Sequence, residues 1–298
     1  MKSNRKGSLL ITALLAMAFF SVLAASLAWG AAQQTAMMKR LDDRMQARLD
    51  CTSVIQGLAY QLSLEAGPAG DTRSKSWYGP WPEVPFVENR MSVHVEDEEG
   101  KLNLNYATEA WLDLFFKRLE EKGVELRGDV KKYARLIKKL RTERRIKSVE
   151  TLLMDEDFDT ADYGALLQWV TVYPEDPRVN LNTADLFILD TLIEVLAGDY
   201  AVKQILKGRL FEFLSSQAVN GNAYFSAEEL QPDIFMRKLK LPVTPPMTMV
   251  VQAFLSGVTA DSEFWRLQMT AQSRLHFETV LRLRPGELYP SILKWQER

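Results

Sequence analysis

The first forty residues carry the clearest hydrophobic pattern of the chain. No charged residue occurs between Gly7 and Met38, and residues 9–32 are almost continuously apolar. About 20 apolar residues in a row are enough to cross the hydrocarbon core of a bilayer as a helix. Basic residues precede this stretch, namely Lys2, Arg5 and Lys6. Since basic flanks stay on the cytoplasmic side, we predict one membrane-spanning helix, with everything after Lys39 outside the cytoplasm.

Three kinds of segment fit this stretch. The first is a cleaved secretory signal peptide, whose apolar core normally spans only about 7–15 residues, although the small residues of 24–32 offer a cleavage site. The second is a signal anchor that stays in the membrane. The third is a prepilin signal, in which cleavage follows a glycine between a basic leader and the apolar helix. Gly7, followed by Ser8, occupies that position.

Helical periodicity continues beyond the apolar stretch. Apolar residues recur at three- and four-residue multiples with charged residues between them: Leu41, Met45, Leu49, Ile55, Leu58 and Leu62. The pattern ends near Gly67, so one helix over residues 8–65 would be roughly 87 Å long. We predict that its first part lies in lipid and that its second part lays an apolar stripe on a globular body.

The rest of the sequence changes period twice. Apolar and polar residues alternate in residues 90–96, and again in residues 264–272, in 274–284 and around Leu293, as in half-buried strands. Between them the period is helical, with predicted helices at residues 107–122, 130–142, 148–154, 161–173, 184–197, 201–217 and 227–230. The lone upstream strand needs partners. We therefore predict an α+β fold in which the long N-terminal helix covers one antiparallel sheet and the helical block is an insertion.

The composition of the chain excludes several classes of binding site and catalytic site. The formal net charge of -2 gives no global attraction to nucleic acid. The single cysteine, Cys51, excludes an intramolecular disulfide and a cysteine-based zinc site. The two histidines, His94 and His276, fall on predicted polar strand faces with no nucleophile motif nearby. We therefore expect a protein that is not an enzyme.

An internal repeat lies within the helical region. Residues 101–119 and 178–196 align at a fixed offset, with these matches: Asn103/Asn180, Leu104/Leu181, Asn105/Asn182, Ala107/Ala184, Leu112/Leu189, Asp113/Asp190 and Leu119/Leu196. The shared segments look like helix-start motifs. Asn105 and Asn182 stand where a helix N-cap is wanted, and Thr183 could serve as well.

Three segments in this order resemble the minor pseudopilin K family of type II secretion systems. They are the basic leader that ends at Gly7 before a long apolar helix, the Glu-Gly-Lys-Leu-Asn-Leu-Asn segment of residues 99–105, and the Val-Asn-Leu-Asn-Thr-Ala segment of residues 179–184. The resemblance covers essentially the whole chain. It implies a pilin-like frame whose two Asn-Leu-Asn segments bracket a helical insertion.

The pattern and the resemblance together predict four parts. Residues 1–7 would be a prepilin leader and residues 8–66 the transmembrane and extended helix. Residues 67–104 and 260–298 would form a discontinuous pilin-like sheet domain. Residues 105–259 would form the helical insertion domain.

The resemblance also implies how the chain is processed and where it sits. Cleavage by prepilin peptidase after Gly7 would make Ser8 the first mature residue and Thr12 the fifth. Pilins generally carry a glutamate there, and K-type pseudopilins typically lack it. A subunit without this carboxylate cannot pair with the terminal amine of a subunit above it. Because an unpaired charge in lipid is costly, such a subunit suits the filament tip. Ser8 replaces the phenylalanine of major pilins, which leaves N-methylation open.

The implied partners are other minor pseudopilins of the I and J types, the pseudopilus, prepilin peptidase and lipid of the bacterial inner membrane. The globular part would lie in the periplasm. There it would initiate the pseudopilus and support protein export across the outer membrane. No nucleic-acid partner is expected.

Two other functions remain open. A Val-Asn-Leu-Asn-Thr-Ala segment also opens helix-hairpin-helix modules of membrane-anchored DNA receptors, which need a glycine-rich hairpin for phosphate. Here Gly198 is followed by Asp199, which is unfavourable for DNA. The basic run of residues 131–147 could hold phosphate, or it could be a solvated helix face. A minor pilin of a type IV pilus system is the other alternative.

An acidic loop raises the question of calcium. Asp155, Asp157 and Asp159 resemble the start of an EF-hand, but Thr160 stands where that loop needs glycine and Leu166 where it needs glutamate. An EF-hand is therefore excluded. Oxygen-rich loops still suit calcium outside the cytoplasm, and some K-type pseudopilins bind it. The three aspartates are thus candidate calcium ligands, with a solvated acidic loop as the alternative.

Overall fold

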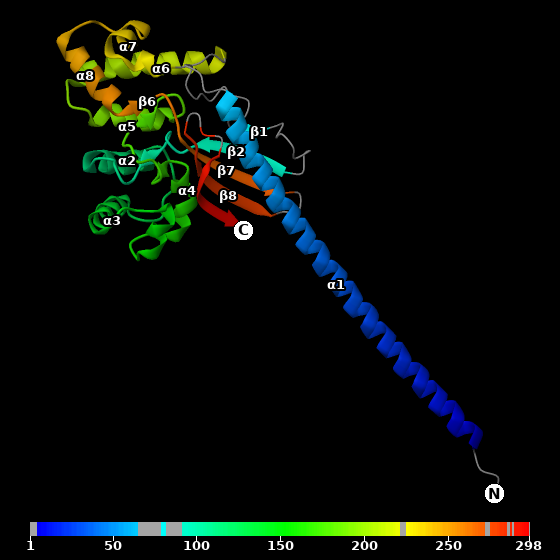
Figure 1. Ribbon diagram of the computed structural model, residues 1–298. Helices are drawn as coiled ribbons and strands as arrows, with labels where there is room; N and C mark the ends of the chain where they lie inside the picture. The colour runs from blue at the N-terminus through cyan, green and yellow to red at the C-terminus, as the bar shows by residue number, and fades with distance from the viewer. Residues whose placement is uncertain are drawn as a thin grey trace.

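A long helix projects from a body made of one sheet and a block of helices (Figure 1). The computed structural model describes residues 5–64, 79–81, 91–220, 225–271, 275–284, 287 and 289–297. Helix α1 (Arg5–Leu64) has its N-terminal half away from the body and its C-terminal part across the sheet. The helical block lies on the side of the sheet away from α1.

The sheet is antiparallel throughout and joins distant parts of the chain. Its strands are β1 (Gly79–Trp81), β2 (Met91–Asp97), β7 (Phe264–Ala271), β8 (His276–Arg282) and β9 (Ser291–Glu297), in the order β1-β2-β7-β8-β9. The pairing of the upstream strand with the C-terminal strands confirms the predicted α+β arrangement. The sequence does not predict strand β1, because three residues are too few to show an alternating period.

One face of the sheet is apolar and carries α1. Alternate residues of the strands form a buried cluster with the C-terminal part of the helix: Met91, Val93, Val95, Trp265, Leu267, Met269, Phe277, Leu281, Cys51, Val54, Ile55 and Leu58. Full burial of one such aliphatic or aromatic side chain contributes about 1.5–3 kcal/mol. This cluster therefore fixes α1 to the body.

The helical block holds a separate and larger core. Its helices are α2 (Glu109–Glu121), α3 (Val130–Glu143), α4 (Tyr163–Leu167), α5 (Leu186–Val195), α6 (Tyr200–Asn220), α7 (Pro232–Lys238) and α8 (Pro245–Ser256). Helices α7 and α8 are absent from the sequence prediction, although a proline stands at the start of each, where proline favours helix initiation.

Three predicted helices differ from the structure. Residues 148–154 and 227–230 form the 3-10 helices η1 (Val149–Met154) and η3 (Glu228–Leu230). Residues 161–173 begin in the 3-10 helix η2 (Thr160–Asp162) and continue as α4, which ends at Leu167. The chain then extends as the short strand β4 (Val170–Thr171), because its β-branched residues pair with an earlier segment.

Two short parallel strand pairs organise the helical block, and the first strand of each pair ends at the first asparagine of an Asn-Leu-Asn segment. Strand β3 (Leu102–Asn103) pairs with β4, and β5 (Val179–Asn180) pairs with β6 (Val258–Thr259). The backbone bonds also correspond: Leu104 N–H donates to Thr171, and Leu181 N–H donates to Thr259, each at 2.8 Å. The repeat seen in the sequence is therefore a repeat of structure.

A buried ion pair joins the sheet to the helical block. The Arg266 guanidinium, on the sheet face opposite α1, donates to Glu98 at 2.6 Å and to Glu278 at 3.0 Å. Thr171 of β4 donates to the other oxygen of Glu98 at 2.6 Å. Burial alone would raise the pKa of Glu98, but Arg266 and then Lys101 outweigh it and lower that pKa to about 2. Glu98 therefore stays charged and holds β7 and β4 together.

The neighbouring residue, Asp97, makes the equivalent connection to the second repeat. Its carboxylate accepts hydrogen bonds from the hydroxyls of Thr183 and Ser262 and, at 3.0 Å, from the amide of Asn180. Gly100 lies against the same place, since a Cβ there would come within 2.9 Å of the Thr183 hydroxyl oxygen. The end of β2 thus contacts both repeats.

Two of the carboxyl groups at this junction resist ionisation. Burial raises the pKa of Asp97 although its hydrogen bonds oppose the shift. Burial, and then the nearby Asp97, raise the pKa of Glu99 from 4.5 to about 9. A protonated Glu99 next to an ionised Glu98 keeps the buried negative charge matched to Arg266 and Lys101.

We expect Glu98→Gln to lower the free energy of unfolding by about 3 kcal/mol, because it removes the main counter-charge of a fully buried guanidinium. The measurement is urea unfolding of the detergent-solubilised chain. Glu212→Gln is the control, since Glu212 pairs with Arg209 in solvent at 3.3 Å and should change stability by less than about 0.5 kcal/mol. Equal losses in the two variants would refute the role of the buried pair.

Stability should also fall as pH rises between about 4.5 and 9. In this range the unfolded chain has an ionised Glu99 whereas the folded chain keeps the proton, so the folded state binds more protons and loses stability with rising pH, by up to about 1.4 kcal/mol per pH unit. Glu99→Gln should flatten this slope in urea unfolding measured at several pH values. An unchanged slope in the variant would show that Glu99 is not the titrating group.

Candidate functional site

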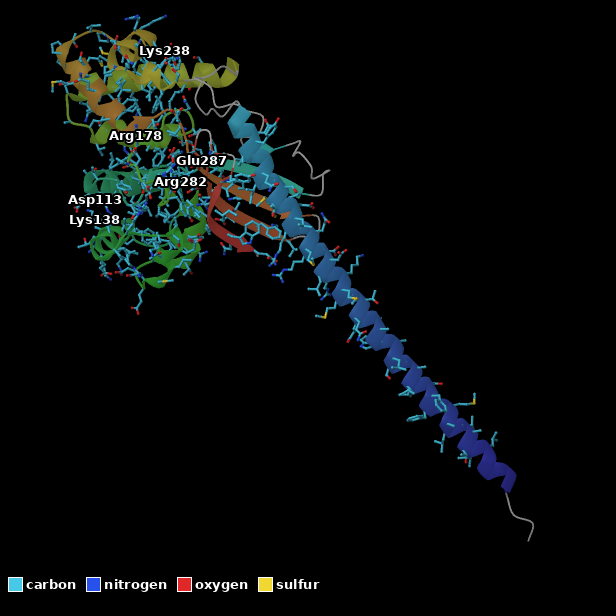
Figure 2. The ribbon with its side chains drawn as sticks, in the orientation of Figure 1. Asp113, Lys138, Arg178, Lys238, Arg282 and Glu287 are labelled. Carbon is cyan, nitrogen blue, oxygen red and sulfur yellow. The ribbon has the colours of Figure 1, made fainter. Side chains whose placement is uncertain are left out.

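The N-terminal half of α1 has no other element beside it. From Leu10 to Gln46 all residues are exposed except Gly30, which is half-buried. Figure 2 shows these side chains surrounding the helix far from the sheet. Among the described residues, α1 is the one helix long and apolar enough to cross a membrane. Bare apolar side chains in such numbers require a non-aqueous environment or partner helices.

The predicted processing residues lie at the start of this helix. Helix α1 begins at Arg5, so Gly7 and Ser8 belong to it, while the surroundings of their side chains lie outside the described part. Thr12 is exposed within the apolar segment. The first acidic residue along the chain is Asp42. The apolar segment therefore offers no carboxylate to a neighbouring helix.

The second part of α1 has two apolar sides rather than one. Ala47 and Cys51 are buried on the sheet, whereas Met45 and Leu49 are 65% and 61% exposed. Residues 47 and 49 differ by about 200° around a helix, so Leu49 lies opposite the sheet. The prediction that Leu41, Met45 and Leu49 pack on the body is therefore wrong, while the burial of Ile55 and Leu58 agrees with it. Leu62 lies outside the described side chains.

We call the exposed row the α1 stripe, and it consists of Met37, Leu41, Met45 and Leu49. These residues follow one another at four-residue steps, so successive members are neighbours and form a row that turns gradually about the helix axis. The four-residue spacing of these apolar residues is visible in the sequence, but the sequence does not show that they face away from the sheet. Basic residues beside the stripe attach α1 to the last strand: Arg44 and Arg48 pair with Glu297 at 2.5 and 2.8 Å. The stripe is therefore held in a fixed orientation and is free to contact another helix.

The expected capping role of the repeated asparagines is wrong. Helix α2 is capped by Thr108, which accepts from Trp111 N–H, and α5 is capped by Asp185, which accepts from Phe187 N–H. Asn105, Asn182 and Thr183 lie a few residues too early. Thr183 instead donates its hydroxyl to Asp97.

The asparagines connect loops that are distant in the sequence. Asn103 and Asn180 each accept a hydrogen bond from the N–H two residues later, at 3.0 and 2.9 Å. Asn105 bonds both the N–H and the C=O of Ile146 at 2.9 Å, and Asn182 does the same to Phe225. Sequence spacing could not show this, since the partners are more than forty positions away.

The three aspartates proposed for calcium do not converge on one point. Asp155 accepts from Lys139 at 3.2 Å, and Asp157 lies 3.6 Å from Lys132. Asp159 accepts from the N–H of Ala161 and so caps η2. Within the described ranges, no group of three or more His, Cys, Asp or Glu side chains could hold a metal ion. The arrangement is that of an acidic loop paired with lysines of α3, and it corrects the expected ligand set.

The turn that would serve a DNA-binding hairpin is occupied by an acid. Asp199 accepts from the N–H of Ala201 at 2.8 Å, at the start of α6. A phosphate at that helix start would need the same N–H group. The carboxylate also repels a phosphate, so this turn is poorly suited to a nucleic-acid backbone.

Comparison with known proteins shows a likeness of fold. No protein-family model matches the sequence, and neither does any curated protein. Among solved structures, the chain is similar to a chain of the crystal structure of the GspK-GspI-GspJ complex from the type 2 secretion system of enterotoxigenic Escherichia coli, with a TM-score of 0.59 and 14% sequence identity. The match covers 89% of this chain and 99% of that chain. At this identity the likeness concerns the fold, and it shows that this chain has a GspK-like fold: a long apolar N-terminal helix, an antiparallel sheet and a helical insertion.

Proposed function

We propose that this chain is a minor pseudopilin at the tip of a type II secretion pseudopilus, where it initiates assembly and supports protein export across the outer membrane. The observation that carries the proposal is the single α1 helix, which is bare and apolar in its first half and fixed to the folded body in its second. A membrane stalk joined rigidly to a globular head is what a subunit extracted from a bilayer into a filament needs.

The membrane position follows from the same helix. We propose that α1 spans the bacterial inner membrane once and that the globular part lies in the periplasm. The basic residues before the apolar segment favour this orientation. The ion pairs between α1 and Glu297 are exposed at the helix side, which suits the polar region just outside a bilayer. Prepilin peptidase would remove residues 1–7.

The tip position rests on two features. Thr12 replaces the carboxylate that would otherwise neutralise the terminal amine of a subunit above, and the described part of α1 contains no acidic residue before Asp42. A subunit above would therefore bring an unpaired amine into lipid, at a cost of several kcal/mol. The helical insertion also widens the head on the side away from α1 (Figure 1). Both features oppose stacking of a further subunit on top.

The partners proposed are minor pseudopilins of the I and J types, and the contact proposed is the α1 stripe. The similar crystal structure is itself a complex of three such chains. Four large apolar side chains in a row along a helix, each more than half exposed, provide the seam that a neighbouring helix buries. No enzymatic activity is part of the proposal.

A minor pilin of a type IV pilus is the second candidate, since it would share the stalk and the sheet. A membrane-anchored DNA receptor is the third, and Asp199 at the start of α6 disfavours it. Retardation of a DNA fragment by the purified chain would support the receptor and contradict the pseudopilin.

Intact-mass analysis of the membrane-extracted chain should show the loss of Met1–Gly7 alone, because the proposed signal is cut before the apolar helix. Gly7→Leu should abolish this cleavage in cells that contain prepilin peptidase. Ala24→Leu, which changes the alternative site for an ordinary signal peptidase, is the control and should be processed like the natural chain. Loss of about thirty residues would remove the stalk and overturn the proposal.

The double variant Leu41→Ala, Met45→Ala should weaken co-purification with I- and J-type pseudopilins at least tenfold, because two apolar side chains of the seam contribute about 1.5–3 kcal/mol each. Its unfolding midpoint should stay the same, since both side chains are exposed in the single chain. Tyr60→Ala is the control, because Tyr60 is 57% exposed on α1 but outside the stripe. Undiminished co-purification of the double variant would place the contact elsewhere.

A further inference from the structure

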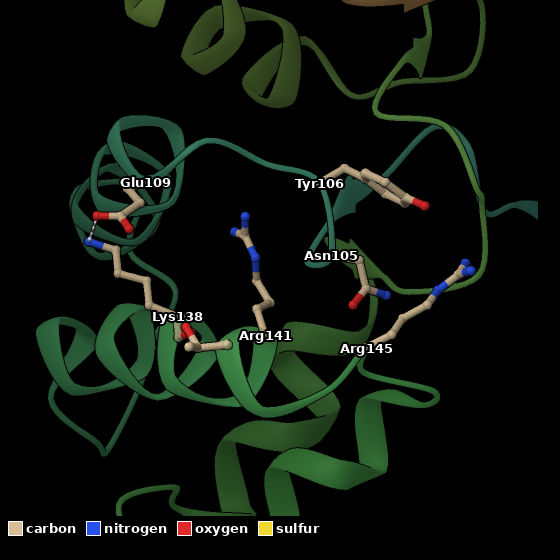
Figure 3. A pocket seen from close by; sticks show the side chains of 7 residues that line it. Asn105, Tyr106, Glu109, Lys138, Arg141 and Arg145 are labelled. Carbon is tan, nitrogen blue, oxygen red and sulfur yellow. Dashed lines mark hydrogen bonds and ion pairs between the residues drawn. The ribbon is translucent and has the colours of Figure 1, made fainter.

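A pocket lies between the loop that begins the first repeat and the C-terminal half of α3 (Figure 3). Its volume is about 450 Å³, within the range of sites that hold small ligands or peptide side chains. Tyr106 and Glu109 contribute to one side, and Lys138, Arg141 and Arg145 come from α3 and the residues after it. Helices α2 and α3 lie on the side of the body away from α1, so neighbouring α1 helices would leave the pocket open.

The pocket is cationic although Lys138 is already paired. Lys138 Nζ lies 3.0 Å from Asp113, with both residues labelled in Figure 2, and 3.5 Å from Glu109, as the dashed line in Figure 3 marks. The two arginines carry the remaining charge. Among the described residues, Arg145 has one ion pair, to Glu175 at 3.8 Å between two exposed side chains, and such a pair is weak.

Arg141 is oriented but has no acidic partner in the described part of the chain. Its Nη1 donates to the carbonyl oxygen of the buried Ala107 at 2.7 Å. This bond fixes the side chain while the guanidinium, which carries five N–H groups in a planar fork, stands in the open space between Glu109 and Tyr106 (Figure 3). A guanidinium held in this way is suited to a carboxylate that binds through both oxygens.

The wall beside Arg141 is aromatic and rigid. Arg145 lies over the ring of Tyr106, with 5.9 Å from its Cζ to the ring centroid. The preceding residue, Asn105, holds the loop by its bonds to Ile146 and to the carbonyl of Val172. In the second repeat the position of Tyr106 is taken by Thr183, which is buried on Asp97. Tyr106 is therefore exposed in the first repeat, whereas the equivalent Thr183 joins the second repeat to the sheet.

The charges around α3 favour a carboxylate over a polyphosphate. Three lysines of this helix are paired with acids: Lys132 with Asp157, Lys138 with Asp113, and Lys139 with Asp155. Lys131 and Arg135 are exposed and have no ion pair among the described residues. The basic run is thus not a continuous track for a phosphate backbone. Two neighbouring arginines with a carboxylate, Glu109, at the rim suit a ligand of low charge.

We propose that this pocket binds an acidic side chain of an extended segment of a partner protein. Arg141 would bind the carboxylate through two hydrogen bonds, and Tyr106 and Arg145 would flank it. The site stands on its own geometry. It rests on the proposed function only in that the segment would belong to a protein met in the periplasm, such as an exported one. Failure of the pocket would leave the stalk, its processing and the α1 stripe untouched.

The test is fluorescence anisotropy with the full chain in detergent and a fluorescein-labelled peptide of alternating Glu and Gly residues. A matching Gln-Gly peptide is the neutral probe. We expect the Glu peptide to bind at least tenfold more tightly than the Gln peptide. Arg141→Gln should remove this difference, and Arg141→Lys should reduce it, because lysine keeps the charge but loses the planar fork.

Lys131→Gln is the matched control, since Lys131 is exposed on the same helix and lies outside the pocket. Tyr106→Ala tests the wall without touching the bond to Ala107 and should weaken the Glu peptide severalfold. Unchanged unfolding midpoints of the Arg141 variants show that they are folded. Equal loss in Lys131→Gln and Arg141→Gln, or displacement of the peptide by inorganic phosphate at lower concentration than by acetate, would overturn the proposal.

Discussion

The Arg266 guanidinium is almost completely buried between Glu98 and Glu278, on a sheet that must be covered on both faces. A charge in that position is tolerated only if its partners are present and correctly placed. Glu98 reaches Arg266 when β2 has paired with β7, and Thr171 of β4 donates a hydrogen bond to the same carboxylate. The sheet and the first repeat of the insertion are therefore stable together.

This coupling gives the insertion a defined position on the sheet although more than 160 residues separate β2 from β7. Adjacent residues at the end of β2 contact different repeats, since Glu98 bonds the first and Asp97 bonds the second. On the opposite face, the apolar cluster fixes α1. A force applied to α1 would thus reach the insertion through a sheet with packed apolar residues on one side and a matched charge network on the other. A head that moves as one body with its stalk is what the proposed extraction from a bilayer would require.

The parts that the sequence could predict are those governed by local period. The apolar span, the long helix and the alternating strands each repeat over enough residues for the pattern to be distinct, and the sheet closure followed from the lone upstream strand. The misplaced features depend on partners far along the chain. Asn105 and Asn182 look like caps in sequence, but their hydrogen bonds go to Ile146 and Phe225. Likewise, the apolar residues of α1 form a regular row, and only the position of the sheet decides that Ile55 is buried and Met45 is exposed.

The two repeats share the same local structure but use one equivalent position, Tyr106 or Thr183, in different ways. Each begins with a short strand, an asparagine that accepts the N–H two residues on, and a second asparagine that holds a distant loop. The next residue then differs. Thr183 is buried and bonds Asp97, so the second repeat uses this position to join the sheet. In the first repeat that junction is made by Thr171 on Glu98, which leaves Tyr106 at the surface beside Arg145 and Arg141. Because the fold does not need the Tyr106 side chain at the junction, its aromatic ring is available to line a surface pocket. In that pocket the Arg141 guanidinium is oriented by the Ala107 carbonyl and has no acidic partner in the described part of the chain.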